Sequence, residues 1–261
     1  MSERDSYPAG VPCWVDNLVP DPERAMAFYG ELFGWEFDGP GPGPGDYYVA
    51  RLRGQDVAGV GRAPEGVQPG WNTYVSVTSA DDAARAAAAA GGRVVAEPFD
   101  ALPAGRLAAI ADPTGGLFGV WQAAERQGCQ LVNEASAYSM SVLHTGEPET
   151  AGAFYRELFG WEAEGFGAPG LSLLRLPGFV GGEPQQPVPR DVVAVMAPPA
   201  GEAAPTVWAV GFWVSDADAL ADQVADLGGS VVIPPFDSIP SRQALLSDPF
   251  GAPFSVSTAA H

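Results

Sequence analysis

A nine-residue motif that occurs twice is the feature that most constrains how this chain folds. Phe28–Glu36 reads FYGELFGWE, and 126 residues later Phe154–Glu162 reads FYRELFGWE, so eight of nine positions are identical. Further landmarks follow each copy in the same order, namely Gly91-Gly92 with Gly228-Gly229 and Asp112-Pro113 with Asp248-Pro249. The chain is therefore a tandem duplication, and its 261 residues accommodate two domains of similar size.

A polar stretch after the first copy marks the boundary between the domains. We expect domain 1 over residues 1–124, a linker over 125–136 and domain 2 over 137–261. The second copy is longer between Gly178 and Pro205, where Pro, Gly and Gln are frequent. Such a segment predicts an excursion on the surface.

Each half reads as strand, helix and three strands, and then repeats that order. Asp21 and Pro22 are typical of an N-cap and a first helical residue, apolar residues then recur at helical spacing, and Gly34 ends the helix. The other expected helices start near Asp81 and cover 148–159 and 216–227. The expected strands are 11–18, 35–38, 46–52, 55–62, 72–77, 93–97, 106–111 and 117–122, then 138–144, 171–176, 192–196, 207–214, 230–233, 243–247 and 253–257. The predicted fold class is α+β.

The charged residues exclude several kinds of function. There are 32 acidic residues against 13 basic ones, a net charge of -19, and every basic residue is an arginine. Without lysine the chain has neither a Schiff-base nucleophile nor a P-loop, and its acidity opposes nucleic-acid binding. The histidines are His144 and the terminal His261, too few for a site that needs several.

Cysteine usage and the N-terminus indicate the compartment. Cys13 and Cys129 lack metal-ligand or CxxC spacing, so we expect two reduced thiols, with Cys13 inside a strand. The polar N-terminus does not resemble a signal peptide, and no apolar stretch reaches 18 residues. We therefore expect a cytoplasmic protein without a membrane partner.

The repeated motifs resemble those of the vicinal oxygen chelate superfamily, which includes glyoxalase, bleomycin-resistance and extradiol-dioxygenase type proteins. They are Asp21–Tyr29 running into Leu32–Trp35, followed by Asp112–Gly116 before a last strand. The resemblance covers nearly the whole chain twice and is closest to tandem two-domain members from actinobacteria. It implies paired βαβββ modules whose sheets curl into a cup around a ligand cavity.

The same resemblance implies where a metal would be bound. Metal-dependent members place His, Glu or Gln on the first and last strands of each module. The matching positions here are Trp14, one of residues 58–60, Asn72 and Gly119, then Met140, one of residues 193–195, Ala209 and Ser255. Since these positions carry no imidazole, carboxylate or thiolate, we expect no metal, no cofactor and none of the metal-dependent activities of the superfamily.

Side chains two residues away from those positions face the same cup. In domain 1 this gives Trp14, Asp16, Asn72, Tyr74 and Trp121 around Gly119. In domain 2 it gives Met140, Val142, His144, Gly211, Ser255 and Ser257, a set of mostly small or apolar residues. Trp208, Phe212, Trp213 and Phe236 are candidate stacking surfaces near the second cup, although aromatic residues on a sheet equally fit core packing.

Three functions stay open on this pattern. The first is a metal-free binding protein that sequesters a hydrophobic aromatic small molecule, such as a drug or natural product; the acidic surface also admits a cationic ligand. The second is a metal-free enzyme of specialised metabolism, of hydroxylase, cyclase or isomerase type, with Asp16, Tyr74 and His144 transferring protons. The third is a scaffold or interaction protein with closed cups. For the single residues, Asp16 equally fits a solvent-facing or hydrogen-bonded carboxylate, and His144 a capping or exposed side chain.

Overall fold

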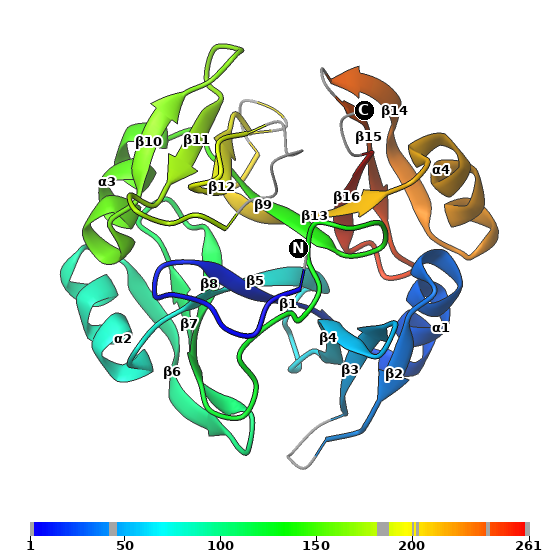
Figure 1. The fold of residues 1–261 in the computed structure, drawn as a ribbon, viewed down its shortest axis with the longest axis horizontal. Helices are drawn as coiled ribbons and strands as arrows, with labels where there is room; N and C mark the ends of the chain where they lie inside the picture. Colours follow the sequence, from blue (N-terminus) through cyan, green and yellow to red (C-terminus); the bar gives the residue numbers. More distant parts are fainter. Residues whose placement is uncertain are drawn as a thin grey trace.

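Two eight-stranded sheets of the same topology form the molecule. The computed structural model describes residues 3–41, 46–181, 188–199, 201, 204–238 and 241–258. The strand orders are β2-β3-β4-β1-β5-β8-β7-β6 and β10-β11-β12-β9-β13-β16-β15-β14. This confirms the predicted α+β class and the two tandem domains. In Figure 1 the second sheet lies above the first, with α2 and α3 on one side and α1 and α4 on the other.

The first sheet belongs to domain 1. Its elements are β1 (Pro12–Val19), α1 (Pro22–Phe33), β2 (Glu36–Asp38), β3 (Tyr47–Leu52), β4 (Gln55–Arg62), β5 (Gly70–Ser76), α2 (Ala80–Ala89), β6 (Arg93–Ala101), β7 (Gly105–Ala111) and β8 (Leu117–Ala123). The second sheet contains β9 (Tyr138–His144), α3 (Pro148–Phe159), β10 (Glu162–Gly165), β11 (Ser172–Arg175), β12 (Val192–Ala197), β13 (Val207–Val214), α4 (Ala217–Asp226), β14 (Ser230–Ser238), β15 (Ser241–Ser247) and β16 (Pro253–Thr258).

The first helix forms as its sequence predicts. The Asp21 carboxylate accepts a hydrogen bond from the backbone N–H of Arg24, Pro22 occupies the first turn, and Gly34 ends the helix in a left-handed conformation with a φ of 71°. The second helix differs, because Ser79 caps it rather than Asp81, and its hydroxyl accepts from the N–H of Asp82. Asp81 instead pairs with Arg106 on β7.

Three strand predictions are corrected by the structure. The sequence pattern missed β10, because all four of its side chains are exposed and show no apolar alternation. The strands β6 and β14 continue beyond their predicted ends at residues 97 and 233. Proline residues lie in both extensions, and register shifts accommodate them where they interrupt the pairing.

The hydrophobic cores are shared between the domains. Phe28, Tyr29 and Phe33 of α1 pack with Phe212 and Phe254 of domain 2 in one core. In the other core, Phe118 of β8 packs against Phe154 and Tyr155 of α3. Helices that lie in different domains therefore meet on each flank, α1 beside α4 and α2 beside α3.

Paired polar contacts fasten the two domains together. The Tyr29 hydroxyl donates to Asp248, and the Tyr155 hydroxyl donates to Asp112 at 2.7 Å. In the repeated motif, the indole N–H of Trp35 donates to the carbonyl of Ser136, just as that of Trp161 donates to the carbonyl of Gly10. The two halves of the duplication thus hold each other by equivalent bonds.

The segment between the domains is hydrogen-bonded to the strands β1 and β4 of the first sheet. The backbone N–H of Cys129 donates to the carbonyl of Cys13 at 2.7 Å, and that of Gln130 donates to the carbonyl of Asp56. Both cysteines are buried free thiols, as the sequence predicts, and Cys13 lies in β1.

Some sequence predictions fall on undescribed positions. Residues 182–187, 200, 202 and 203 of the expected excursion, and His261, lie outside the described residues. In the part of the chain that is described, no helix has the length and apolar character to cross a membrane.

Candidate functional site

One face of each sheet packs on helices and on the other domain, and we call the opposite side the inner face. In domain 1 the alternation along β1 sends Asn17 toward Tyr29 and Asp248, so Trp14 and Asp16 lie on the inner face. Strand pairing places Tyr74 beside Trp14 and Asn72 beside Asp16. The structure thus brings together four of the residues that the sequence singled out in domain 1.

Asp16 is the centre of a hydrogen-bonded cluster on the inner face of domain 1. Its side chain is buried, and one carboxylate oxygen, Oδ1, accepts from the amide of Asn72 at 2.9 Å. The other oxygen, Oδ2, accepts from the hydroxyls of Tyr74 at 3.0 Å and Tyr47 at 3.1 Å. The indole N–H of Trp14 in turn donates to the Tyr47 hydroxyl at 2.9 Å.

Burial shifts the proton affinity of this cluster. Desolvation raises the pKa of Asp16 from 3.8 to about 6, although the hydrogen bonds from Asn72, Tyr74 and Tyr47 oppose that shift. Desolvation and the neighbouring Asp16 charge raise the pKa of both tyrosines well above the ordinary value of 10.0. Asp16 is therefore the member that changes its protonation near pH 6, while both phenols keep their protons.

Aromatic rings fill the floor of this inner face. A Cβ atom added to Gly59 would lie 2.0 Å from the Tyr47 hydroxyl, and one added to Gly119 would lie 2.1 Å from the Tyr74 ring. Sequence reasoning missed Tyr47; the signal for it is Gly61, which pairs with Tyr47 across β3 and β4 and leaves room for its ring.

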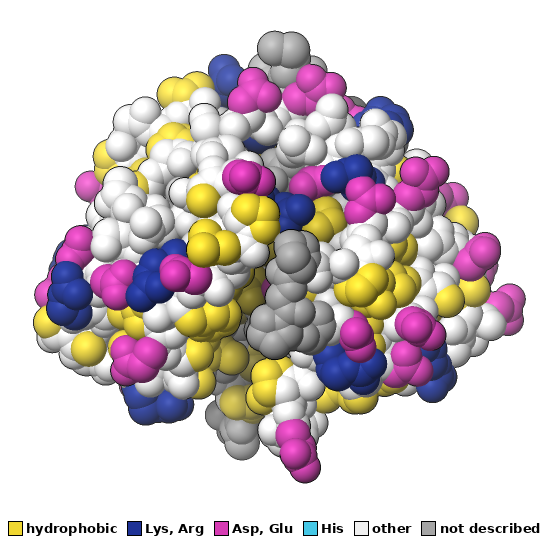
Figure 2. Space-filling model, turned by 90° about the horizontal axis from the view of Figure 1, so that it is seen from below, with side chains coloured by type: hydrophobic (Ala, Val, Ile, Leu, Met, Phe, Trp, Pro, Cys, Tyr) yellow, Lys and Arg dark blue, Asp and Glu magenta, His cyan; other side chains and the backbone are white. Residues whose placement is uncertain are grey.

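The linker closes the floor beside these rings. The Arg126 guanidinium lies over the Trp14 ring at 5.4 Å, and the Trp121 indole donates to the Arg126 carbonyl at 2.9 Å. Trp14 and Trp121 are both buried. Figure 2 views the molecule from the side of domain 1 and shows hydrophobic side chains gathered on both sides of the middle of this face. Exposed Phe99 and Leu102, on and just after β6, contribute to the apolar surface of this domain.

The inner face of domain 2 carries much smaller side chains at the same positions. Met140 pairs with Gly211 as Trp14 pairs with Tyr74, and Val142 pairs with Ala209 as Asp16 pairs with Asn72. Ser257 takes the place of Trp121. Five of these inner-face residues are only partly buried: Met140, Val142, Ala209, Ser255 and Ser257. Among the described residues, these positions therefore carry no ring like those of Trp14, Tyr74 and Trp121 in domain 1.

A row of four side chains crosses the inner face of domain 2. Trp213 pairs with Ser257, Ser257 with Gln243, and Gln243 with Phe236. Directly paired residues point to the same side of a sheet, so two aromatic residues stand at the ends of a polar floor. Three strand spacings separate them, roughly 14 Å. Trp213 is half-buried, and Phe236 is exposed.

Two predicted stacking residues lie on the wrong side of β13 for this face. Trp208 donates its indole N–H to the Tyr155 hydroxyl at 2.8 Å, and fully buried Phe212 packs on Phe33 in the core between the domains. The reason is the alternation of a strand, which turns both away from Ala209 and Gly211. Trp208 and Phe212 are thus core residues and not part of the candidate site.

His144 lies apart from the other residues assigned to acid-base chemistry. It ends β9 in domain 2, and its Nδ1 atom is 3.0 Å from the carbonyl oxygen of Pro198. Asp16 and Tyr74 are in domain 1. The three predicted catalytic residues therefore do not form one site.

The positions that hold a metal in the superfamily do not fit one here. Strand register resolves the uncertain positions to Gly59 and Val195, which pair with Asp16 and Val142. The full sets are Trp14, Gly59, Asn72 and Gly119, and Met140, Val195, Ala209 and Ser255. Among the described residues there is also no group of three or more His, Cys, Asp or Glu placed to bind a metal.

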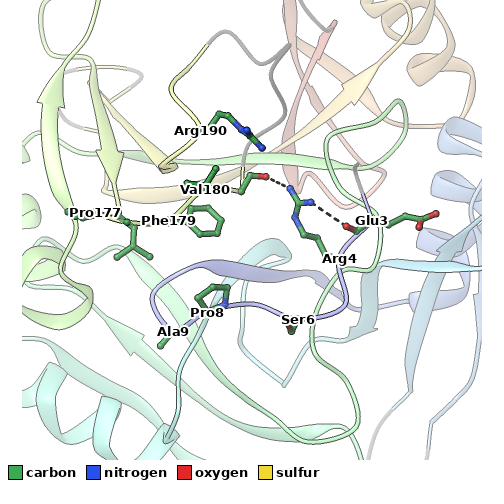
Figure 3. Close-up of a pocket in the computed structure, with 12 residues that line it drawn as sticks. Glu3, Arg4, Ser6, Pro8, Ala9, Pro177, Phe179, Val180 and Arg190 are labelled. Carbon is green, nitrogen blue, oxygen red and sulfur yellow. Dashed lines mark hydrogen bonds between the residues drawn. The ribbon is translucent and has the colours of Figure 1, made fainter.

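A pocket that the sequence did not indicate lies between the N-terminal segment and domain 2. Its volume is about 820 Å³, and its walls come from the N-terminal residues 3–4, 6 and 8–9 and from residues 176–181 and 190 of domain 2. Figure 3 shows Phe179 beside it and Arg4, whose guanidinium donates to the carbonyl of Gly181. No sequence signal could have found this pocket, because its walls are far apart in the chain.

Known proteins are similar to this chain in sequence. A model of the glyoxalase-like domain matches residues 13–121 and again 140–257. The putative glyoxylase CFP32 of Mycobacterium tuberculosis is 39% identical over 264 residues, which is 98% of this chain and 97% of that protein. The anthracycline biosynthesis protein DauV of Streptomyces sp. strain C5 is 32% identical over 268 residues, which is 96% of this chain and 94% of that protein.

A solved structure shows the same fold at lower sequence similarity. The Mn(II)-bound glyoxalase from Novosphingobium aromaticivorans superposes with a TM-score of 0.67 at 18% identity, covering 97% of this chain and 83% of that chain. At this identity the match shows the fold alone.

Proposed function

The chain belongs to the glyoxalase-like domain family, and on that premise we propose that it binds a flat, hydrophobic aromatic small molecule on the inner face of domain 2, without a metal. The observation that supports this most is the difference between two otherwise equivalent faces. In domain 1 the rings of Tyr47, Tyr74 and Trp121 occupy the floor, whereas domain 2 has Gly211 and Ser257 where two of those rings stand. Because aromatic ligands bind by burying apolar area, the face that the described side chains fill less is the better site.

The row across domain 2 fits a fused ring system. Trp213 and Phe236 offer aromatic surfaces at the ends of the row, and Ser257 and Gln243 offer hydrogen bonds between them. Such a mixture of apolar walls and a few polar groups is typical of small-molecule sites.

The kind of ligand follows from this chemistry and from the relatives. DauV is a protein of anthracycline biosynthesis by name, and polycyclic aromatic compounds of that kind have the flat shape that the row accommodates. The net charge of -19 raises the local concentration of cations, so a ligand that carries an amine is favoured further.

Calorimetry with an anthracycline and with a simple anthraquinone tests the proposal. We expect a dissociation constant in the micromolar range or tighter, unchanged by a chelator. Trp213→Ala removes one aromatic wall, and Ser257→Trp places on this floor the residue that fills domain 1; each should weaken binding at least tenfold.

Val67→Ala is the matched control, because Val67 is exposed in domain 1 and lies outside both inner faces. Binding no tighter than millimolar across both compounds, or binding that both domain 2 variants leave intact, would reject the proposal.

A further inference from the structure

The hydroxyl of Tyr74 has an open acceptor position. It donates its proton toward Oδ2 of Asp16, so the remaining lone pairs of its oxygen point elsewhere. Tyr47 donates to the same carboxylate oxygen, but its own oxygen already accepts from the Trp14 indole. Among the described residues none donates to the Tyr74 oxygen, and Tyr74 is only partly buried. Of the two phenols, Tyr74 is therefore the one whose oxygen keeps an acceptor position for a ligand hydroxyl.

We infer that the inner face of domain 1 is a second site, where Tyr74 accepts the proton of an acidic ligand hydroxyl while passing its own proton to Asp16. The inference is independent of the binding proposed for domain 2, because it concerns the opposite sheet and other residues.

The proton transfer is balanced within the cluster and its ligand. The O–H bond of the ligand breaks as a new O–H bond forms on Tyr74, and the original Tyr74 proton moves to Oδ2 of Asp16. The carboxylate becomes a neutral carboxylic acid, and the negative charge moves to the ligand oxygen. No oxidant, reductant or metal is consumed.

Burial makes Asp16 a better proton acceptor than an ordinary aspartate, since it raises the pKa of that carboxyl to about 6. A base of this strength ionises only hydroxyls that are themselves acidic. The substrate class is therefore phenols and enols conjugated to a carbonyl group, as in hydroxyquinones and 1,3-diketones.

Few charged groups act on the cluster. Arg126 lies over Trp14 and favours negative charge at Tyr47, and it is itself bonded to Asp56 at 3.2 Å. Asp56 also pairs with Arg51. The strand β4 contributes only Gly59 directly beside Asp16. Asp16, with a pKa of about 6, is therefore the group of this cluster that we expect to titrate near pH 6.

A pH titration of 1,2-dihydroxyanthraquinone, followed by its absorption spectrum with and without the protein, tests the inference. The bound dye should ionise at least one pH unit lower than the free dye, which is a tenfold change in its ionisation constant. Tyr74→Phe keeps the ring over Gly119 and removes the hydroxyl, so it should abolish the shift, and Asp16→Asn should do the same.

Glu157→Gln is the control, because it removes an exposed carboxylate on α3 far along the chain from the cluster. Circular dichroism of each variant shows whether it has lost the site alone or has failed to fold. If Asp16→Asn does not fold, the result for Tyr74→Phe tests the inference.

Several results would overturn the inference. One is that the wild-type protein leaves the ionisation constant of the dye unchanged. Another is that folded Tyr74→Phe still lowers the pH at which the dye ionises. Dye that binds without ionising rejects this inference while the domain 2 proposal stands. A shift that Ser257→Trp abolishes and Tyr74→Phe retains would place the ionisation in domain 2.

Discussion

The duplication places very different residues at one position of the two sheets. Asp16 of domain 1 corresponds to Val142 of domain 2, and both lie beside the central antiparallel strand pair of their sheet. A buried valine needs no hydrogen-bond partner. A buried carboxylate does, and Asp16 accepts hydrogen bonds from Asn72, Tyr74 and Tyr47. The difference between Asp16 and Val142, together with the donors around Asp16, thus separates a titratable surface from an apolar one.

Asp16 should make the stability of the protein depend on pH. Its pKa is about 6 in the folded chain against 3.8 as the ordinary value, so between these pH values the folded state holds a proton that the unfolded state has lost. Its contribution to the free energy of unfolding is therefore complete below about pH 4 and falls as pH rises through 6, by about 3 kcal/mol. Asp16→Asn removes this dependence.

Urea unfolding of wild type and Asp16→Asn across pH 4 to 7 measures the effect. The free energy of the variant relative to wild type should rise with pH over that window. A difference that stays constant with pH would show that Asp16 keeps its charge throughout.

Alternation within single strands decides which aromatic residues can meet a ligand. On β13, Trp208 and Phe212 point into the core, while Trp213 belongs to the inner face. On β8, Gly119 lacks a side chain and so admits the ring of Tyr74 from β5. A glycine in one strand therefore shapes the site by leaving room for a side chain of the neighbouring strand.

Gly119→Ala should disturb the cluster without touching it chemically. The added methyl group would lie 2.1 Å from the Tyr74 ring, which must move and lose its bond to Asp16. We expect a destabilisation of about 1–3 kcal/mol, as for other overpacked sites. Denaturant unfolding measures it.

Gly70→Ala is the matched control, since Gly70 also lies in a strand and an added Cβ there meets no atom within 4 Å. Equal losses from both substitutions would mean that the strand backbone, and not the Tyr74 ring, sets the cost.

The two domains share their hydrophobic cores, so we expect the whole molecule to unfold as one unit. Each hydrophobic core draws on both domains, and the bonds from Tyr29 to Asp248 and from Tyr155 to Asp112 cross between them in both directions. Neither half can bury its aromatic face alone.

Residues 1–124 and 137–261 produced separately should therefore lack cooperative unfolding, while the full chain unfolds in one transition. Far-ultraviolet circular dichroism and tryptophan fluorescence of the full chain should give coincident denaturation curves. Two separated transitions, or a half that unfolds cooperatively by itself, would contradict shared cores.

Patterns along the chain determined the duplication, the α+β class and most strand and helix positions. These depend on periodicity, caps and repeats, which are local properties. They did not predict the exposed β10, the capping of α2 by Ser79 or the extensions of β6 and β14 past their proline residues. The same alternation correctly grouped Trp14, Asp16, Asn72 and Tyr74 in domain 1.

The tertiary structure alone decided how the two inner faces differ. Tyr47 donates to Asp16 from β3, a strand that follows β1 by about 30 residues. Phe212 packs against Phe33 of the other domain. Whether an aromatic side chain fills a core, closes a floor or faces a ligand depends on which strand lies opposite. That pairing is set by long-range packing, so no local pattern contains it.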